Sequence, residues 1–163
     1  MAVENLKGSL VGTNVTASPA VNANVAHAHG RIRTLQDKVE VTAAASATST
    51  YSFGYIPTNA VIGYDSKLYW DDLGTTAGTG DLGLFAVDGN ITDDDNALIS
   101  AFNFATSASN SGLLSDISKI GQYVWEHAGA TSDPGGVVEI KVTLDAAAQA
   151  GGTLALDLKY TID

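Results

Sequence analysis

The densest set of possible metal ligands in this 163-residue chain is an acidic run within residues 90–97. Calcium takes six to eight oxygen ligands, and carboxylates supply them well. The run lacks the EF-hand spacing, in which alternate acidic residues precede a glycine and a distal glutamate. We therefore expect a solvated acidic loop and no bound cofactor. The weak metal candidates are Asp93, Asp94 and Asp95, and the Asp71-Asp72 pair has the same interpretation.

Two of the three histidines form an H-x-H pair, His27 and His29. On a strand, residues two apart point to the same face, so two imidazoles there could bind a transition metal. No cysteine or carboxylate lies nearby in sequence to complete such a site. We interpret both as polar side chains near a subunit contact, and we expect His127 at the end of a strand over residues 123–127.

No catalytic motif is present. The nucleophile elbow G-x-S-x-G and the phosphate-binding loop G-x-x-x-x-G-K-[ST] do not occur, and the one G-x-G-x-x-G match, Gly78 to Gly83, follows Trp-Asp-Asp and does not open a helix. The Gly-rich residues 74–83 contain no lysine and do not lead into a helix. A pair of carboxylates for glycoside hydrolysis stays open as an alternative. We expect no enzyme activity and assign no catalytic residue.

Four aromatic residues could form a flat platform for a sugar ring: Tyr64, Tyr69, Trp70 and Trp125. Aromatic side chains serve more often as core residues or as interface anchors, because each buries a large apolar area. We favour a role in the core or at an interface.

Charge and composition exclude several classes of partner. The formal net charge is −10 and the isoelectric point is about 4.4, so the surface repels phosphate backbones and anionic lipids. We expect neither nucleic acid nor membrane as a partner. The chain has no cysteine, which excludes disulfides and thiolate-bound metals. We see no signal peptide and no apolar run of about 18 residues that could span a membrane.

The first aromatic residue is Tyr51, so the first third of the chain can hardly form its own core. We predict an extended N-terminal arm over residues 1–35 and a β-sandwich domain over residues 36–163. Ordering costs about 1–2 kcal/mol per residue of backbone entropy, so the arm needs cover from the body or from a neighbouring subunit. An unstructured tail is the alternative. The candidate capsid or subunit contacts are Leu6, Leu10, Val11, Val15, Val21 and Val25.

The rest of the chain predicts a mainly β fold, an antiparallel β-sandwich or jelly roll. About eight short strands are separated by turn signals, and the helices that a parallel α/β fold needs are missing. Apolar residues alternate along residues 138–144 and 154–162, and we predict that these two strands pair as a hairpin. Tyr51, Phe53 and Tyr55 are expected on one face of a strand. One short helix is predicted over residues 111–122.

Three stretches together resemble a known family. They are Gly30-Arg31-Ile32-Arg33 with residues 55–62, Leu68-Tyr69-Trp70-Asp71-Asp72-Leu73-Gly74 with residues 82–85, and Val124-Trp125-Glu126 with residues 133–136 and 151–160. This layout resembles small virion proteins of tailed bacteriophages, of the head decoration (cement) type. The resemblance covers nearly the whole chain, and its motifs are structural rather than chemical.

The resemblance implies a non-enzymatic subunit, often a homotrimer, on the outside of the capsid. It would bind the major capsid protein, stabilise contacts between capsid subunits and assemble in the host cytoplasm. The alternatives are another phage structural part (a head-fibre base, a tail component or a minor capsid subunit), a calcium- or sugar-binding adhesive module, and a hydrolase on a jelly-roll scaffold.

Overall fold

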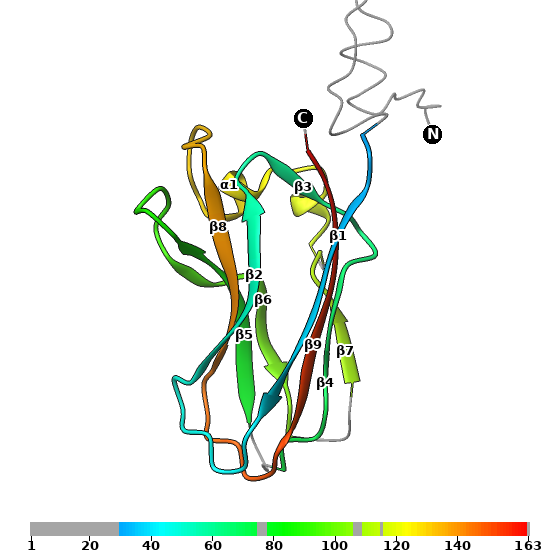
Figure 1. The fold of residues 1–163 in the computed structure, drawn as a ribbon, viewed down its shortest axis with the longest axis vertical. Helices are drawn as coiled ribbons and strands as arrows, with labels where there is room; N and C mark the ends of the chain where they lie inside the picture. Colours follow the sequence, from blue (N-terminus) through cyan, green and yellow to red (C-terminus); the bar gives the residue numbers. More distant parts are fainter. Residues whose placement is uncertain (1–29, 75–77, 106–108, 115, 163) are drawn as a thin grey trace, which may run out of the picture.

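Two antiparallel β-sheets pack face to face (Figure 1). The computed structural model describes residues 30–74, 78–105, 109–114 and 116–162. The elements in chain order are β1 (Arg33–Val41), β2 (Thr50–Pro57), β3 (Ala60–Ile62), β4 (Lys67–Trp70), β5 (Thr79–Ala86), β6 (Asp94–Asn103), β7 (Ser109–Gly112), a 3-10 helix (Ile117–Lys119), α1 (Val124–His127), β8 (Val137–Leu144) and β9 (Gly152–Ile162).

The first sheet has the order β1-β9-β4-β7, and β3 pairs with the end of β9. The second sheet has the order β2-β8-β5-β6. Every pairing between these strands is antiparallel, so the predicted mainly β sandwich with one short helix is confirmed. No helix in the described ranges is long and apolar enough to span a membrane.

The core lies between the sheets. Along β8 and β9 every second side chain points inward, because successive residues of a strand face opposite sides. Most of the predicted inward residues are buried: Val138, Ile140, Val142 and Leu144 from β8, and Leu154, Leu156 and Leu158 from β9. Tyr160 and Ile162, also predicted to face inward, are partly buried and pack against the core. They are joined by Leu82 and Leu84 of β5 and by Phe102 and Phe104.

The predicted hairpin between the last two strands is wrong. β8 pairs with β2 and β5, whereas β9 pairs with β1, β3 and β4. Residues 145–151 cross from one sheet to the other, and two backbone hydrogen bonds, Ala44 N to Ala148 O and Ala148 N to Ala45 O, hold this crossing. Alternation specifies which face of a strand is buried but not its partner, so two such strands can face each other across a core.

The predicted helix over residues 111–122 is also wrong. The segment contains the end of β7 and the 3-10 helix, and α1 forms over residues where a strand was expected. The Asp116 carboxylate caps the 3-10 helix by accepting a hydrogen bond from Ser118 N at 2.9 Å. Ile117 and Ile120 are exposed, so the apolar residues at helical spacing do not form one buried stripe.

Gly54 interrupts the expected row of aromatic residues on β2. The pairing with β8 shifts register between Ser52 and Gly54, and Gly54 has a φ of 138°. A bulge adds one residue to a strand, so the side chains after it point to the opposite face of the sheet from the one that simple alternation predicts. As a result Phe53 is buried while Tyr55 is exposed on the outside of the second sheet.

Candidate interaction surfaces

The acidic run organises a strand connection and does not gather into a cation site. The Asp93 carboxylate accepts a hydrogen bond from Ala86 N at 2.7 Å, and the Asp94 carboxylate accepts one from Asn96 N at 3.2 Å. β6 starts at Asp94, so the loop is shorter than expected. Across the described ranges, no three His, Asp or Glu side chains lie together in a way that could hold a metal ion.

The two glutamates on alternating strands, Glu40 and Glu139, lie on opposite sheets. Glu40 accepts a hydrogen bond from the Thr153 hydroxyl at 2.8 Å. Glu139 accepts one from the Ser52 hydroxyl at 2.6 Å and pairs with Lys141 at 2.9 Å. The Ser52 hydroxyl, and then Lys141, hold the pKa of Glu139 below its usual value. These two carboxylates support sheet structure and cannot act as a pair.

The four aromatic residues considered as a sugar platform occupy different places. Trp70 is buried and packs on Phe102, with ring centroids 4.8 Å apart. Trp125 lies on α1 and stacks on Tyr123 at 5.9 Å. Tyr69 is exposed on β4, and Tyr64 is exposed in the turn after β3. Trp70 is therefore a core residue, as favoured from the sequence.

His127 lies on α1 rather than at the end of a strand, and it is buried. Neither ring nitrogen has a hydrogen-bond partner in the described part of the chain. Burial, followed by the positive charge of Lys119, lowers its pKa to about 4. His27 and His29 lie outside the described residues, as do the six candidate contact residues of the predicted arm.

An apolar groove lies where the chain enters β1. We call it the arm-root groove; it has a volume of about 280 Å³. Its apolar lining consists of Ile32, Val61, Ile62, Ile120 and Tyr160. Ile32 is 67% exposed and Ile120 is 51% exposed, so the rim consists of large apolar side chains that face solvent.

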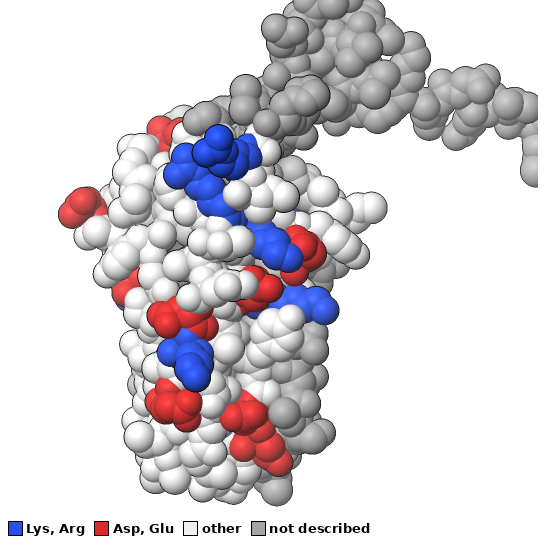
Figure 2. Space-filling model, turned by 45° about the vertical axis from the view of Figure 1, so that its right-hand side comes forward, with Lys and Arg blue, Asp and Glu red and all other residues white. Residues whose placement is uncertain are grey.

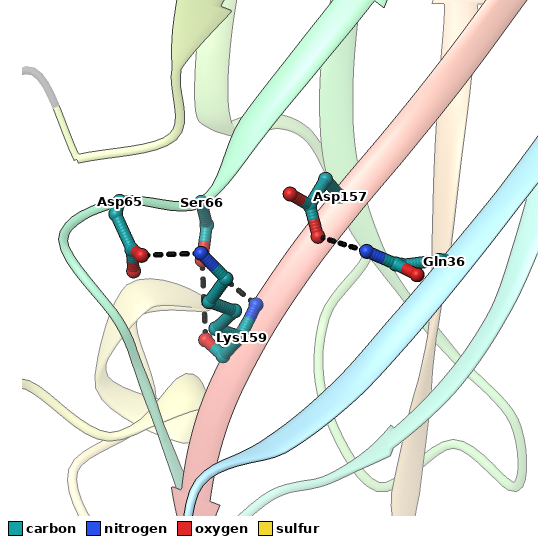
Figure 3. A network of polar contacts seen from close by, with 5 residues as sticks. All are labelled: Gln36, Asp65, Ser66, Asp157 and Lys159. Carbon is teal, nitrogen blue, oxygen red and sulfur yellow. Dashed lines mark hydrogen bonds and ion pairs between the residues drawn. The ribbon is translucent and has the colours of Figure 1, made fainter.

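A polar network holds one wall of the arm-root groove in place (Figure 3). Lys159 forms an ion pair with Asp65, and the Asp65 hydrogen bond raises the pKa of Lys159. The buried Ser66 hydroxyl accepts a hydrogen bond from Lys159 N at 3.0 Å and donates one to Lys159 O at 3.1 Å. Gln36 on β1 donates to Asp157 on β9 at 2.8 Å. The turn over residues 63–66 is thus fixed to β9.

Basic residues collect on the same side of the molecule. Five of the eight Lys and Arg residues belong to the first sheet or precede it directly: Arg31, Arg33, Lys38, Lys67 and Lys159. Figure 2 shows Lys and Arg side chains in a broken band on one face, with acidic side chains between and below them. For a chain with net charge −10, this distribution leaves the rest of the surface strongly acidic.

The second sheet carries an exposed apolar patch on its outer face, which we call the aromatic face. It consists of the exposed Tyr55, Val87 and Val137 and the half-buried Pro57 and Phe85. Tyr55 and Phe85 flank Glu139 in the register of β2, β8 and β5. Lys141 Nζ lies 4.3 Å from the centroid of the Phe85 ring, which is a cation–π contact. Tyr55 is 56% exposed, and Val87 and Val137 are also exposed.

Sequence reasoning missed both surfaces. The aromatic face depends on the pairing of β2 and β5 with β8, which no local pattern indicates. The arm-root groove depends on Ile120 lying beside the start of β1. The sequence contains one signal that Ile120 lies at the surface. Ile120 stands between a capping residue, Asp116, and a glycine, Gly121, and this pattern is typical of a short surface turn.

The fold is shared with chains from two phage capsids. A chain in the capsid asymmetric unit of cyanophage Pam1 aligns with a TM-score of 0.60 at 18% identity, over 91% of this chain and 97% of that chain. A chain in the capsid of Ralstonia phage GP4 aligns with a TM-score of 0.52 at 20% identity, over 80% of this chain and 85% of that chain. No family model and no curated protein matches the chain. Both alignments span most of both chains, so what is shared is the fold of a whole small subunit.

Proposed function

We propose that this chain is a non-enzymatic structural subunit of a phage virion, a decoration (cement) protein. It binds the outer surface of the head and stabilises contacts between major capsid subunits. The observation that carries the proposal is the alignment, over nearly full length, with chains from two phage capsids. The sequence resemblance to decoration proteins supports the finer assignment.

The exposed apolar surfaces favour a role in assembly. Soluble monomers rarely expose large contiguous apolar patches, and such patches mark interaction sites. This chain exposes large apolar side chains at the arm-root groove and on the aromatic face, where Glu139 lies between Tyr55 and Phe85. In the proposal, the arm residues Leu6, Leu10, Val11 and Val15 add a third apolar contact, on a neighbouring copy or on the major capsid protein.

Charge supports the same role. Complementary potentials steer association and select partners. A chain with net charge −10 suits a capsid surface that carries basic residues. The proposed partners are the major capsid protein and further copies of this chain in a homotrimer, located on the virion exterior after assembly in the host cytoplasm.

The direct test is co-sedimentation with capsids prepared without this subunit. The full chain is expected to pellet with them, and a chain lacking residues 1–29 is expected to remain in the supernatant while keeping the β-sheet circular dichroism of the body. If the full chain stays in the supernatant at micromolar concentrations, the decoration role is wrong. Equal binding by the shortened chain would remove the arm from the proposal.

The aromatic face allows a matched substitution test. The double variant Tyr55→Ser/Val137→Ser removes exposed apolar area from the second sheet, and Tyr69→Ser does the same on the first sheet. Interface aromatic residues often contribute more than about 1 kcal/mol, so the double variant should bind capsids about tenfold more weakly. Equal losses in both variants would argue against the aromatic face as the contact.

The proposed homotrimer is checked by light scattering on the purified chain with and without EDTA. The expected result is a trimer that resists the chelator. A monomer in both conditions contradicts the homotrimer, and a chelator-sensitive monomer favours the calcium-binding module. The other phage structural parts differ from a decoration protein by location, which electron microscopy of labelled particles reveals.

A further inference from the structure

The arm-root groove lies at the point where the N-terminal segment joins the body. Ile32 is on its rim, and the chain that precedes Gly30 is 29 residues long. Any segment that leaves the body at Gly30 therefore starts within a few residues of an exposed apolar surface. The position of this junction identifies a candidate for the groove's occupant.

The part of the segment closest to the body carries two β-branched apolar residues, Val21 and Val25, among alanine and asparagine. Val25 is five residues before Gly30, and five extended residues span at most about 17 Å. Gly30 accepts the backbone conformations that a reversal of direction requires. Val25 can thus return to the groove without any rearrangement of β1.

We propose that the arm-root groove binds Val25 and Val21 of the same chain. The occupant is an apolar β-branched pair, which fits a groove lined by Ile32, Ile120 and Tyr160. The groove's volume, about 280 Å³, lies just below the range of pockets that take drug-sized ligands and suits a few side chains.

The same copy is favoured over a second copy because of its tether. A short tether gives an effective concentration in the millimolar range, well above the micromolar concentration of free copies. Docking of Val21 and Val25 would fix the direction in which residues 1–20 leave the body. The distal residues Leu6, Leu10, Val11 and Val15 would remain available for a partner. This inference does not depend on the proposed function.

Because the chain contains no cysteine, an engineered pair can test the contact without background. In the variant Val25→Cys/Ile120→Cys, mild oxidation should close a disulfide within one chain, since a disulfide requires Cα atoms about 4.4–6.8 Å apart. The matched control is Val25→Cys/Val137→Cys, whose second cysteine is exposed at the same end of the other sheet. The groove pair should react about tenfold faster.

A non-reducing gel separates the outcomes. A covalent monomer that forms faster with Ile120→Cys than with Val137→Cys supports the proposal. A covalent dimer would show that the segment occupies the groove of a second copy, which overturns the proposal. Equal rates at the two positions would show that the segment only diffuses around the body, which also overturns it.

Hydrogen exchange on the full-length chain provides a second test without a crosslink. The variant Val21→Asp/Val25→Asp should raise the exchange rate of residues 117–121, because its charged side chains disfavour the apolar groove. The control Leu6→Asp/Leu10→Asp adds the same charge to the distal part of the segment and should leave that rate unchanged. No difference between the two variants would refute the docking of Val21 and Val25. Both tests use the isolated protein, so they can fail while capsid binding succeeds, or the reverse.

Discussion

The buried His127 makes the stability of this protein depend on pH. Its side chain is only 6% exposed, and neither ring nitrogen has a hydrogen-bond partner in the described ranges. Burial, then the charge of Lys119, lowers its pKa from 6.5 to about 4. The folded protein therefore holds a neutral imidazole at pH values where the unfolded chain holds a protonated one.

The size of the effect follows from linkage between protonation and folding. Above pH 6.5 both states are neutral, and the contribution of His127 to stability is complete. As the pH falls from 6.5 towards 4, only the unfolded chain takes up the proton, so the free energy of unfolding falls. For pKa values of 6.5 and about 4, the loss between pH 7.5 and pH 5 is about 2 kcal/mol.

Urea unfolding at a series of pH values measures this loss, and the variant His127→Leu supplies the reference. Leucine is apolar and of similar size, so the variant should lie within about 1 kcal/mol of the native chain at pH 7.5. All other titrating groups, including His27 and His29, are common to both proteins. The difference between the two pH profiles therefore isolates His127.

The expected result is a native profile that falls about 2 kcal/mol further than the His127→Leu profile between pH 7.5 and pH 5. Parallel profiles would refute the reasoning, because they would mean that His127 is protonated equally in both states. A native profile that rises as the pH falls would mean that folding favours the imidazolium.

Two further substitutions probe charge and packing in the second sheet. Burial, and then the nearby Asp145 carboxylate, raise the pKa of Asp81. In the variant Asp81→Asn, the side-chain oxygen can still accept the hydrogen bond from Ala101 N, which is 2.6 Å long in the native chain. Because the variant carries no charge there, its unfolding free energy at pH 7 should be higher by less than about 1 kcal/mol. This gain should disappear as the pH falls through the raised pKa of Asp81, where the native carboxyl also becomes neutral. Gly83→Ala would place a Cβ 2.2 Å from Asp94 O and should cost about 3 kcal/mol in urea unfolding.

Each of these substitutions has its own check. A Cβ at Gly112 would meet nothing closer than Ser66 O at 4.0 Å, so Gly112→Ala should be nearly neutral. Equal costs at Gly83 and Gly112 would refute the steric explanation. A loss of stability in Asp81→Asn at pH 7 would show that the ionised Asp81 carboxylate favours the fold.

Burial could be predicted from sequence better than pairing. The alternation of Val138, Ile140 and Val142 specifies an inward face because a strand has only two faces. The partner of that strand depends on contacts between residues far apart in the chain. For this reason the inward faces of β8 and β9 were predicted correctly and their pairing was not.

The candidate sites show a similar division. The sequence named single residues as candidates, whereas the interaction surfaces depend on how distant segments are placed in the fold. Tyr55 is exposed just after the register shift at Gly54, and Ile120 is exposed just after the 3-10 helix that stands where a longer helix was predicted. A single bulge and a single short turn thus decide which apolar residues are available for binding.

The way the chain enters the first sheet has a mechanical consequence. Arg33 to Val41 pair with β9 along all nine residues of β1. The hydrogen bonds of an antiparallel ladder run perpendicular to the strands. A pull on the preceding chain, directed along the axis of β1, loads this ladder in shear (Figure 1). The hydrogen bonds of this ladder must then break together rather than one after another. On its other side, β9 is hydrogen-bonded to β3 and β4. A force applied through the N-terminal segment would therefore act on β1, a strand whose pairing with β9 gives it high resistance to mechanical unfolding.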